Sequence, residues 1–182
     1  MCLIIYSVVT YNKLVHMREN VDNAWSQIDV QLKRRYDLVP NLVETVKGYA
    51  THEKETLSRV TEARASVGSA RNTAEAVEAN NQLSSALARL LVVSEKYPDL
   101  KANVNFTSLQ NELTSIENKI AFTRQSYNDT VLLYNRKKKS FPANIVAKIF
   151  KFEDGVYYKA EEVVQEAPQV KFKTLLFSAI LC

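Results

Sequence analysis

A long amphipathic run over residues 20–54 constrains the fold more than any other part of the sequence. Its first half repeats apolar residues at steps of four, three and four, at Val21, Trp25, Ile28 and Leu32. This spacing places all four on one stripe of an α-helix and leaves the charged residues outside it. Trp25 is the only tryptophan, and we expect it to anchor a core, because large aromatic side chains dominate burial.

Two long helices are expected in the first third of the chain. We predict the first over residues 5–35, because Lys33, Arg34 and Arg35 would then complement the negative end of the helix dipole in its last turn. Asp37 would cap a second helix over residues 38–68, where Pro40 falls in the first turn and costs little.

Two more long helices follow. The third is predicted over residues 72–96 and ends at the Tyr97-Pro98 pair. In the fourth, core-type residues alternate steps of three and four from Phe106 to Tyr134, the seam typical of helix bundles. The predicted fold class is therefore all-α, an antiparallel up-and-down four-helix bundle with long helices and short C-terminal helical segments.

The C-terminal segments are shorter and more mixed. An amphipathic piece over residues 142–152 would carry its larger apolar residues on one side and its lysines on the other. The apolar side is Ile145, Val146, Ile149 and Phe150, and the basic side is Lys148 and Lys151. A turn is predicted at Asp154-Gly155, followed by a last helical segment over residues 156–166.

Residues 22–35 and 37–43 carry a pattern that goes beyond helix periodicity. They read DNAWSQIDVQLKRR and DLVPNLV. Further along, the chain has YPDLKAN at 97–103, YN at 127–128 and again at 134–135, FP at 141–142 and PQVKF at 168–172. In this order the segments resemble the signature of the LemA family, over about residues 11–172.

The resemblance implies a bacterial protein with one short N-terminal membrane anchor and a soluble antiparallel helical bundle. It implies no reaction, because the molecular activity of that family is not established. The expected address is the bacterial cell membrane, and the side of the membrane on which the bundle lies stays open.

The resemblance also suggests a division of the chain. Residues 1–12 are uncharged, but as a helix they reach only about 18 Å against roughly 30 Å of hydrocarbon, so we interpret them as the remnant of a truncated N-terminal anchor. Residues 13–140 would form the bundle and 141–172 a short helical extension that packs on it. We interpret the atypical apolar tail at 173–182 as a frameshifted or read-through end rather than a membrane hook.

Residue patterns that carry catalysis or bind metals are scarce. Neither His16 nor His52 has a glutamate three residues before it, so the Glu-x-x-His motif of di-iron bundles is missing from the sequence. Three scattered glycines provide no phosphate-binding loop, and the two cysteines stand at the ends of the chain. We therefore expect no catalytic, metal-binding or cofactor-binding residues, no cofactor and no enzymatic activity.

A run of four basic residues, Arg136, Lys137, Lys138 and Lys139, is the strongest functional signal. A four-helix topology would return it to the end where the anchor lies, and anionic lipid attracts such residues with about 1 kcal/mol each. Together with Lys148 and Lys151 it is our candidate membrane surface. The alternative is a solvated helix end whose side chains bond the last carbonyls. A net charge of only +4 argues against nucleic acid as a partner.

Two Tyr-Asn pairs, at 127–128 and 134–135, lie seven residues apart on the fourth helix, and Tyr11-Asn12 repeats the pair near the start of the chain. We expect the tyrosines to pack at the core edge with hydrogen-bonded hydroxyls. The alternative is a ligand pocket between the helices.

Two functional hypotheses follow. In the first, the chain is a membrane-anchored bundle that acts by binding, as a scaffold, an adaptor or a membrane-shaping factor, with anionic lipids and unidentified membrane or envelope proteins as partners. In the second, it is a small-ligand or metal-binding bundle with a pocket between helices, which could also serve an enzymatic reaction. The oligomeric state stays open.

Overall fold

The computed structural model describes residues 2–159, with side chains from residue 4 onward. This part of the chain is entirely helical apart from turns and one extended segment, which confirms the predicted all-α class. Its six helices, in chain order, are α1 (Cys2–Lys47), α2 (Lys54–Ser69), α3 (Thr73–Ser94), α4 (Pro98–Ala102), α5 (Val104–Lys139) and α6 (Ala143–Ile149).

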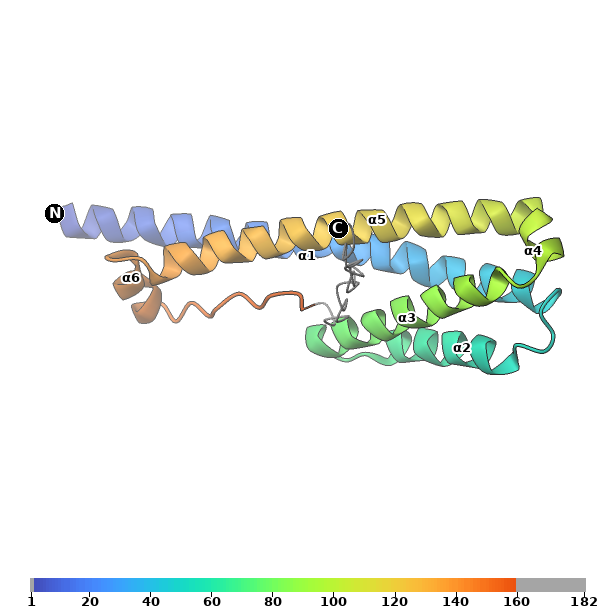
Figure 1. Cartoon of the computed structure of the whole chain (residues 1–182). Helices are drawn as coiled ribbons and strands as arrows, with labels where there is room; N and C mark the ends of the chain where they lie inside the picture. The colour runs from blue at the N-terminus through green and yellow to red at the C-terminus, as the bar shows by residue number, and fades with distance from the viewer. Residues whose placement is uncertain (1, 160–182) are drawn as a thin grey trace, which may run out of the picture.

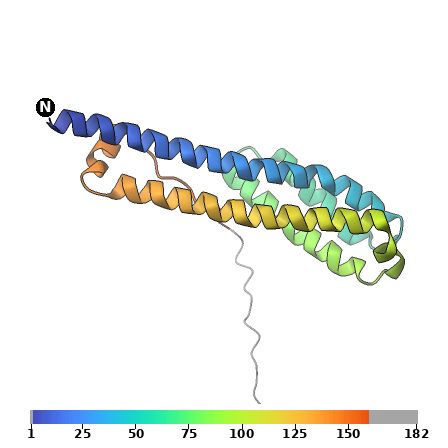
Figure 2. The same ribbon diagram turned by 90° about the horizontal axis from the view of Figure 1, so that it is seen from above.

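The two longest helices, α1 and α5, run antiparallel and side by side along the molecule (Figure 1). The hairpin of α2 and α3 covers them only in the half that holds the turn after α1, as the view from above also shows (Figure 2). In the other half, α6 packs on the start of α1 and the end of α5. The helices are therefore of very unequal length, unlike those of the expected bundle.

The predicted break at residues 36–37 is wrong, because α1 continues to Lys47 with Pro40 inside it. Proline lacks the N–H that would bond the carbonyl of Tyr36, four residues earlier. In this fold Arg64 of α2 replaces that donor, since its Nε lies 3.0 Å from the Tyr36 carbonyl oxygen. The Arg64 guanidinium also lies 3.9 Å from the centre of the Tyr36 ring. Asp37, expected as a cap, is an exposed residue within α1.

Arg35 was expected to complement the helix dipole in the last turn of the first helix, but its side chain is only 1% exposed. Its terminal nitrogens donate to Glu117 Oε1 at 2.8 Å on α5, and to Asn80 Oδ1 at 2.7 Å and Ser84 Oγ on α3. Arg35 therefore ties three helices together from inside the core. Its Nε, and Oε1 of Gln31 one turn earlier, are buried without a hydrogen-bond partner.

The predicted third and fourth helices are confirmed as α3 and α5. Asn72 and Asn103 cap them, each accepting the N–H of the third residue onward. Between them, Pro98 starts the short α4, where its missing N–H is not needed. Ile28 and Leu32 are buried as expected, and Trp25 is partly buried against the same core. The core also contains these residues of α3 and α5: Leu83, Leu87, Leu90, Phe106, Leu113, Ile116 and Ile120.

After α6 the chain reverses at Lys151, whose φ of 53° is left-handed, and not at the predicted Asp154-Gly155 turn. Residues 153–159 then run back along the molecule as an extended, non-helical segment, which we call the strap (Figure 1). The helix predicted over 156–166 is wrong for residues 156–159, and the rest of it lies outside the described residues, as does the tail at 173–182.

Candidate functional site

The basic run at residues 136–139 ends α5, in the half of the molecule where α1 begins (Figure 1). Arg136 is exposed and Lys137 is partly buried. The N–H of Ser140 lies 3.0 Å from the Arg136 carbonyl and 3.2 Å from that of Lys137. Because the backbone caps these carbonyls, the basic side chains are not needed for that task.

Lys138 and Lys139 face an acidic partner from the strap. Nζ of Lys138 lies 2.9 Å from Oδ1 of Asp154, and Nζ of Lys139 lies 3.9 Å from the same oxygen. The hydrogen bond from Lys138 lowers the pKa of Asp154 below its usual value. Asp154 therefore stays ionised at neutral pH and offsets part of the positive charge of the run.

The apolar side of α6 differs from the prediction. Small side chains pack inward, with Ala143, Val146 and Ala147 buried. The larger ones face solvent: Phe141 is 80% exposed and Ile149 is 68% exposed, and Ile145 and Phe150 are also exposed. The lysines Lys148 and Lys151 are exposed in the same short stretch.

The start of α1 adds further exposed apolar residues. Tyr11 joins the two regions, because its ring centre lies 4.7 Å from that of Phe150 and 5.7 Å from that of Phe152. A surface groove of about 410 Å³ runs between α1 and Phe150. Its walls are Ile4, Ser7, Val8, Tyr11 and Phe150. We call the surface formed by residues 4–11, 136–139 and 141–151 the tip.

The two Tyr-Asn pairs of α5 hold the strap. The hydroxyl of Tyr134 donates to the Glu153 carbonyl at 2.9 Å, and that of Tyr127 donates to the Val156 carbonyl at 2.7 Å. These bonds confirm that both tyrosines pack at the core edge with paired hydroxyls. Burial is the main reason why the pKa of each of the two lies above its ordinary value.

The asparagine of each pair forms hydrogen bonds with both the N–H and the C=O of one strap residue. Asn135 donates Nδ2–H to the Gly155 carbonyl at 2.9 Å and accepts the Gly155 N–H at 2.8 Å. Asn128 does the same with Tyr158, at 3.1 Å and 2.8 Å. On α3, Asn81 donates to the Lys159 carbonyl at 3.3 Å.

The structural roles of Arg35, Gly155 and the two asparagines were not predicted from the sequence. The repeat of Tyr-Asn after seven residues was a usable signal, because it puts two identical polar pairs on one helical stripe. The segment that these pairs bond could not be predicted, because residues 156–159 of the strap were expected to be helical.

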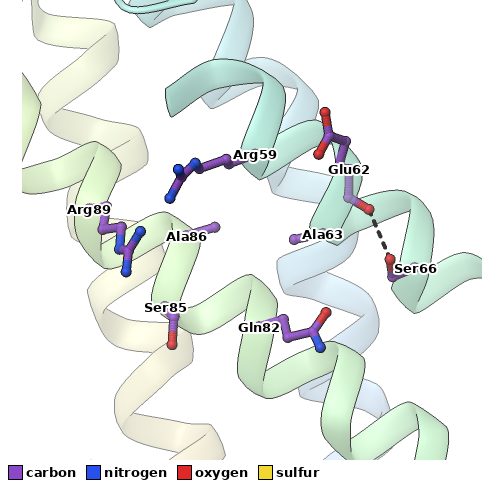
Figure 3. A pocket seen from close by; sticks show the side chains of 8 residues that line it. All are labelled: Arg59, Glu62, Ala63, Ser66, Gln82, Ser85, Ala86 and Arg89. Carbon is purple, nitrogen blue, oxygen red and sulfur yellow. Dashed lines mark hydrogen bonds between the residues drawn. The ribbon is translucent and has the colours of Figure 1, made fainter. Parts of the chain in front are cut away.

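Further grooves lie on the hairpin of α2 and α3. One groove of the hairpin, about 470 Å³, has polar and charged side chains of both α2 and α3 around it, among them Arg59, Glu62, Gln82 and Arg89 (Figure 3). Within residues 2–159, no cluster of three or more His, Cys, Asp or Glu side chains could hold a metal ion. In the same range, none of the helices combines the length and apolar character needed to cross a bilayer.

Together these features define an elongated all-helical protein whose most distinctive surface is an apolar and basic tip. The chain belongs to the LemA family, since the model of that family matches residues 24–172. The resemblance seen in the sequence is thereby confirmed.

Named relatives lie at moderate similarity. Protein LemA of Metamycoplasma hominis is 29% identical over 153 residues, which are 84% of this chain and 70% of that protein. Magnetosome protein MamQ 2 of Paramagnetospirillum magneticum is 25% identical over 178 residues, 84% of this chain and 65% of that protein. Magnetosome protein MamQ of Magnetospirillum gryphiswaldense is 23% identical, with coverages of 83% and 65%. The chain thus spans a little less than two thirds of these magnetosome proteins.

Proposed function

We propose that this chain is a membrane-anchored helical protein that acts by binding, as a scaffold, an adaptor or a membrane-shaping factor, with the tip resting on anionic lipid. The observation that carries the proposal is the segment of residues 141–149, which buries Ala143 and Ala147 but exposes Phe141 and Ile149. Large apolar side chains that face solvent beside lysines are typical of helices that lie in a membrane interface.

The tip combines the two forces that hold a protein on a bilayer. The apolar side chains of α6 can enter the boundary between headgroups and acyl chains, while Arg136, Lys148 and Lys151 face the phosphates. Each basic residue near an anionic surface contributes about 1 kcal/mol. Residues 4–11 of α1 belong to the same surface, and the N-terminal segment at residues 1–12 would be part of the single-pass anchor of a bacterial cell membrane.

The rest of the chain would present partner-binding faces. We propose that α1, α2, α3 and α5 act together as an up-and-down four-helix bundle within residues 13–140, with residues 141–172 as its extension. Three relatives bear names that assign them to the magnetosome and name no reaction, which supports binding over catalysis. Unidentified membrane or envelope proteins would be the partners.

Flotation with liposomes tests the proposal. The intact chain should float with anionic vesicles and much less with neutral ones, and high salt should weaken the binding. Replacing both Arg136 and Lys148 with Gln should lower the partition onto anionic vesicles about 30-fold, at about 1 kcal/mol per charge. Replacing Phe141 and Ile149 with Ser should lower binding at every salt concentration.

Matched controls lie on the middle of α5. Phe122 is 74% exposed, so Phe122→Ser removes a comparable apolar side chain away from the tip. Lys119→Gln removes a comparable exposed charge. If these controls reduce flotation as much as the tip variants, or if the tip variants float as the unmodified chain does, the proposed membrane surface is wrong.

A second candidate function rests on one cavity. A pocket of about 390 Å³ lies between α1, α3, α5 and the strap, and Trp25, Val77, Tyr127 and Tyr158 are among its walls. An apolar pocket with a few polar groups is the usual form of a small-ligand site. A thermal-shift screen with metals, nucleotides and lipids should raise the melting temperature if such a ligand binds the native state, and a flat screen would remove this candidate.

A further inference from the structure

The spacing of the Tyr-Asn pairs on α5 matches the spacing of the strap residues that they bond. One Tyr-Asn pair is repeated after seven helical residues, which rise about 10.5 Å. The strap carbonyls that the two tyrosines bond belong to Glu153 and Val156, three residues apart, and three extended residues span about 10 Å. Each pair therefore meets the strap in the same register.

Recognition within this repeat uses main-chain groups. Asn128 and Asn135 each bond one N–H and one C=O of a single residue, as a neighbouring β-strand would. The side chains of Val156 and Tyr157, between the two gripped residues, are exposed. This face of α5 therefore binds the main chain of an extended segment, and it does not select the side chains at the two middle positions of the strap.

Two side-chain positions add selectivity. A Cβ at Gly155 would lie 3.1 Å from Cγ1 of Val131 and 3.3 Å from Cδ1 of Tyr134, so the first position favours glycine. The ring of Tyr158 is buried, with the Trp25 ring centre at 6.0 Å and the Arg124 guanidinium 4.4 Å from its own ring centre. The fourth position therefore favours an aromatic residue, stacked under a cation.

The sequence supplies one segment that satisfies both positions. It has three glycines, and only Gly155 has an aromatic residue three positions later, since Thr51 follows Gly48 and Arg71 follows Gly68 at that distance. A short link at residues 150–152 joins this segment to α6. The link is strained, because Lys151 adopts a left-handed φ that disfavours residues other than glycine. None of the groove contacts involves that link.

We propose that this face of α5, with Tyr127, Asn128, Tyr134 and Asn135, is a binding groove for an extended Gly-x-x-Tyr peptide segment, and that a second copy of this chain supplies the segment by exchanging straps. The contacts made in exchange are identical to those made within one chain. Exchange of an identical element is accordingly a low-cost route to a linked pair.

A labelled peptide of residues 152–159 tests the groove by fluorescence anisotropy. The host is the full chain with Tyr158→Ala, which weakens the hold on its own strap. This host should bind the peptide at least tenfold more tightly than the unmodified chain does, and a peptide with Gly155→Val should bind at least tenfold more weakly. Adding Asn128→Ala and Asn135→Ala should abolish binding.

The matched control adds Asn111→Ala and Asn118→Ala, two exposed asparagines of α5, to the same host and should leave binding unchanged. Circular dichroism checks that each host is helical. The groove is overturned if a folded Tyr158→Ala host binds neither peptide, or binds both equally.

Exchange between copies is tested by complementation. A chain with Gly155→Val keeps its groove but loses a well-fitting strap, and a chain with Asn128→Ala and Asn135→Ala keeps its strap but loses the groove. Mixed and gently warmed, they should form a one-to-one complex by light scattering that neither forms alone. Gly155→Ala serves if the valine variant does not fold. Two folded chains that stay separate at concentrations well above the peptide Kd would refute the exchange.

Discussion

Arg35 decides how the first third of the chain folds. The apolar stripe continues through it at steps of four and three, from Ile28 and Leu32 to Arg35, Val39 and Leu42. An arginine at a core position requires acceptors, and α3 and α5 provide them. The spacing contained this information, but the charge of Arg35 and the proline that follows suggested a helix end instead.

Replacing Arg35 with Lys should lower the free energy of unfolding by about 3 kcal/mol. Lysine cannot reach acceptors on two helices with one ammonium group, so buried oxygens of Asn80 and Ser84 lose their donor. Urea unfolding followed by circular dichroism measures the change. Arg34→Lys, at the exposed neighbour, should stay within about 0.5 kcal/mol, and equal effects of the two would contradict the buried network.

At the scale of elements, α1 survives an internal proline because another helix provides the missing donor. Arg64 bonds the Tyr36 carbonyl that Pro40 leaves free. Helix propensity and proline rules act locally, so the sequence alone predicted that α1 ends before Pro40. The compensating Arg64 lies 28 residues after Tyr36 in the chain, and nothing in the local pattern points to it.

A double-mutant cycle isolates this compensation. Arg64→Ala should cost about 2 kcal/mol, because it leaves a carbonyl without its partner and removes the contact with the Tyr36 ring. In a Pro40→Ala background the cost should fall by about half, since the new N–H can bond Tyr36. Arg59→Ala, also on α2, breaks only an exposed pair with Glu55 and should have little effect. Equal costs in both backgrounds would mean that Arg64 does not replace the proline's donor.

Two tyrosine hydroxyls bind the strap to α5, so the stability that these bonds contribute depends on pH. The folded-state pKa values of Tyr127 and Tyr134 are raised above 10.0 by burial. Their contribution to stability is therefore complete below pH 10.0 and is lost as the pH rises through the raised values. An alkaline titration followed by tyrosinate absorbance should show a late phase that shrinks by one tyrosine in Tyr127→Phe. A late phase unchanged by that substitution would contradict the paired hydroxyl, and Tyr157→Phe, which removes an exposed hydroxyl, serves as the control.

At the scale of the whole molecule, the sequence predicted the helical class, α3, α5 and the family pattern, because these follow from long periodic segments. It did not predict the unequal halves. The tip and the strap depend on which helix covers which part of α1, and that follows from long-range contacts such as those of Arg35 and Arg64.

Asp154 of the strap faces Lys138 and Lys139 of the tip, so its charge should affect the proposed binding of the tip to anionic lipid. Asp154→Asn removes the negative charge that faces Lys138 and Lys139, so it should raise binding to anionic vesicles about fivefold, at about 1 kcal/mol per charge. Flotation at low salt measures the change. Asp99→Asn, at the far end of the molecule on α4, is the control, and a rise of the same size there would show a general charge effect.

The length of the unbroken α1 also sets the distance between the tip and the opposite end of the molecule. Its 46 residues span about 70 Å, so a molecule standing on its tip would hold the turn after α1 roughly that far above the lipid. The surface potential of a membrane fades within about 8 Å in physiological salt. The α2–α3 end would then sense no field from the bilayer that carries it, and whatever binds there would be selected by shape and local charge alone.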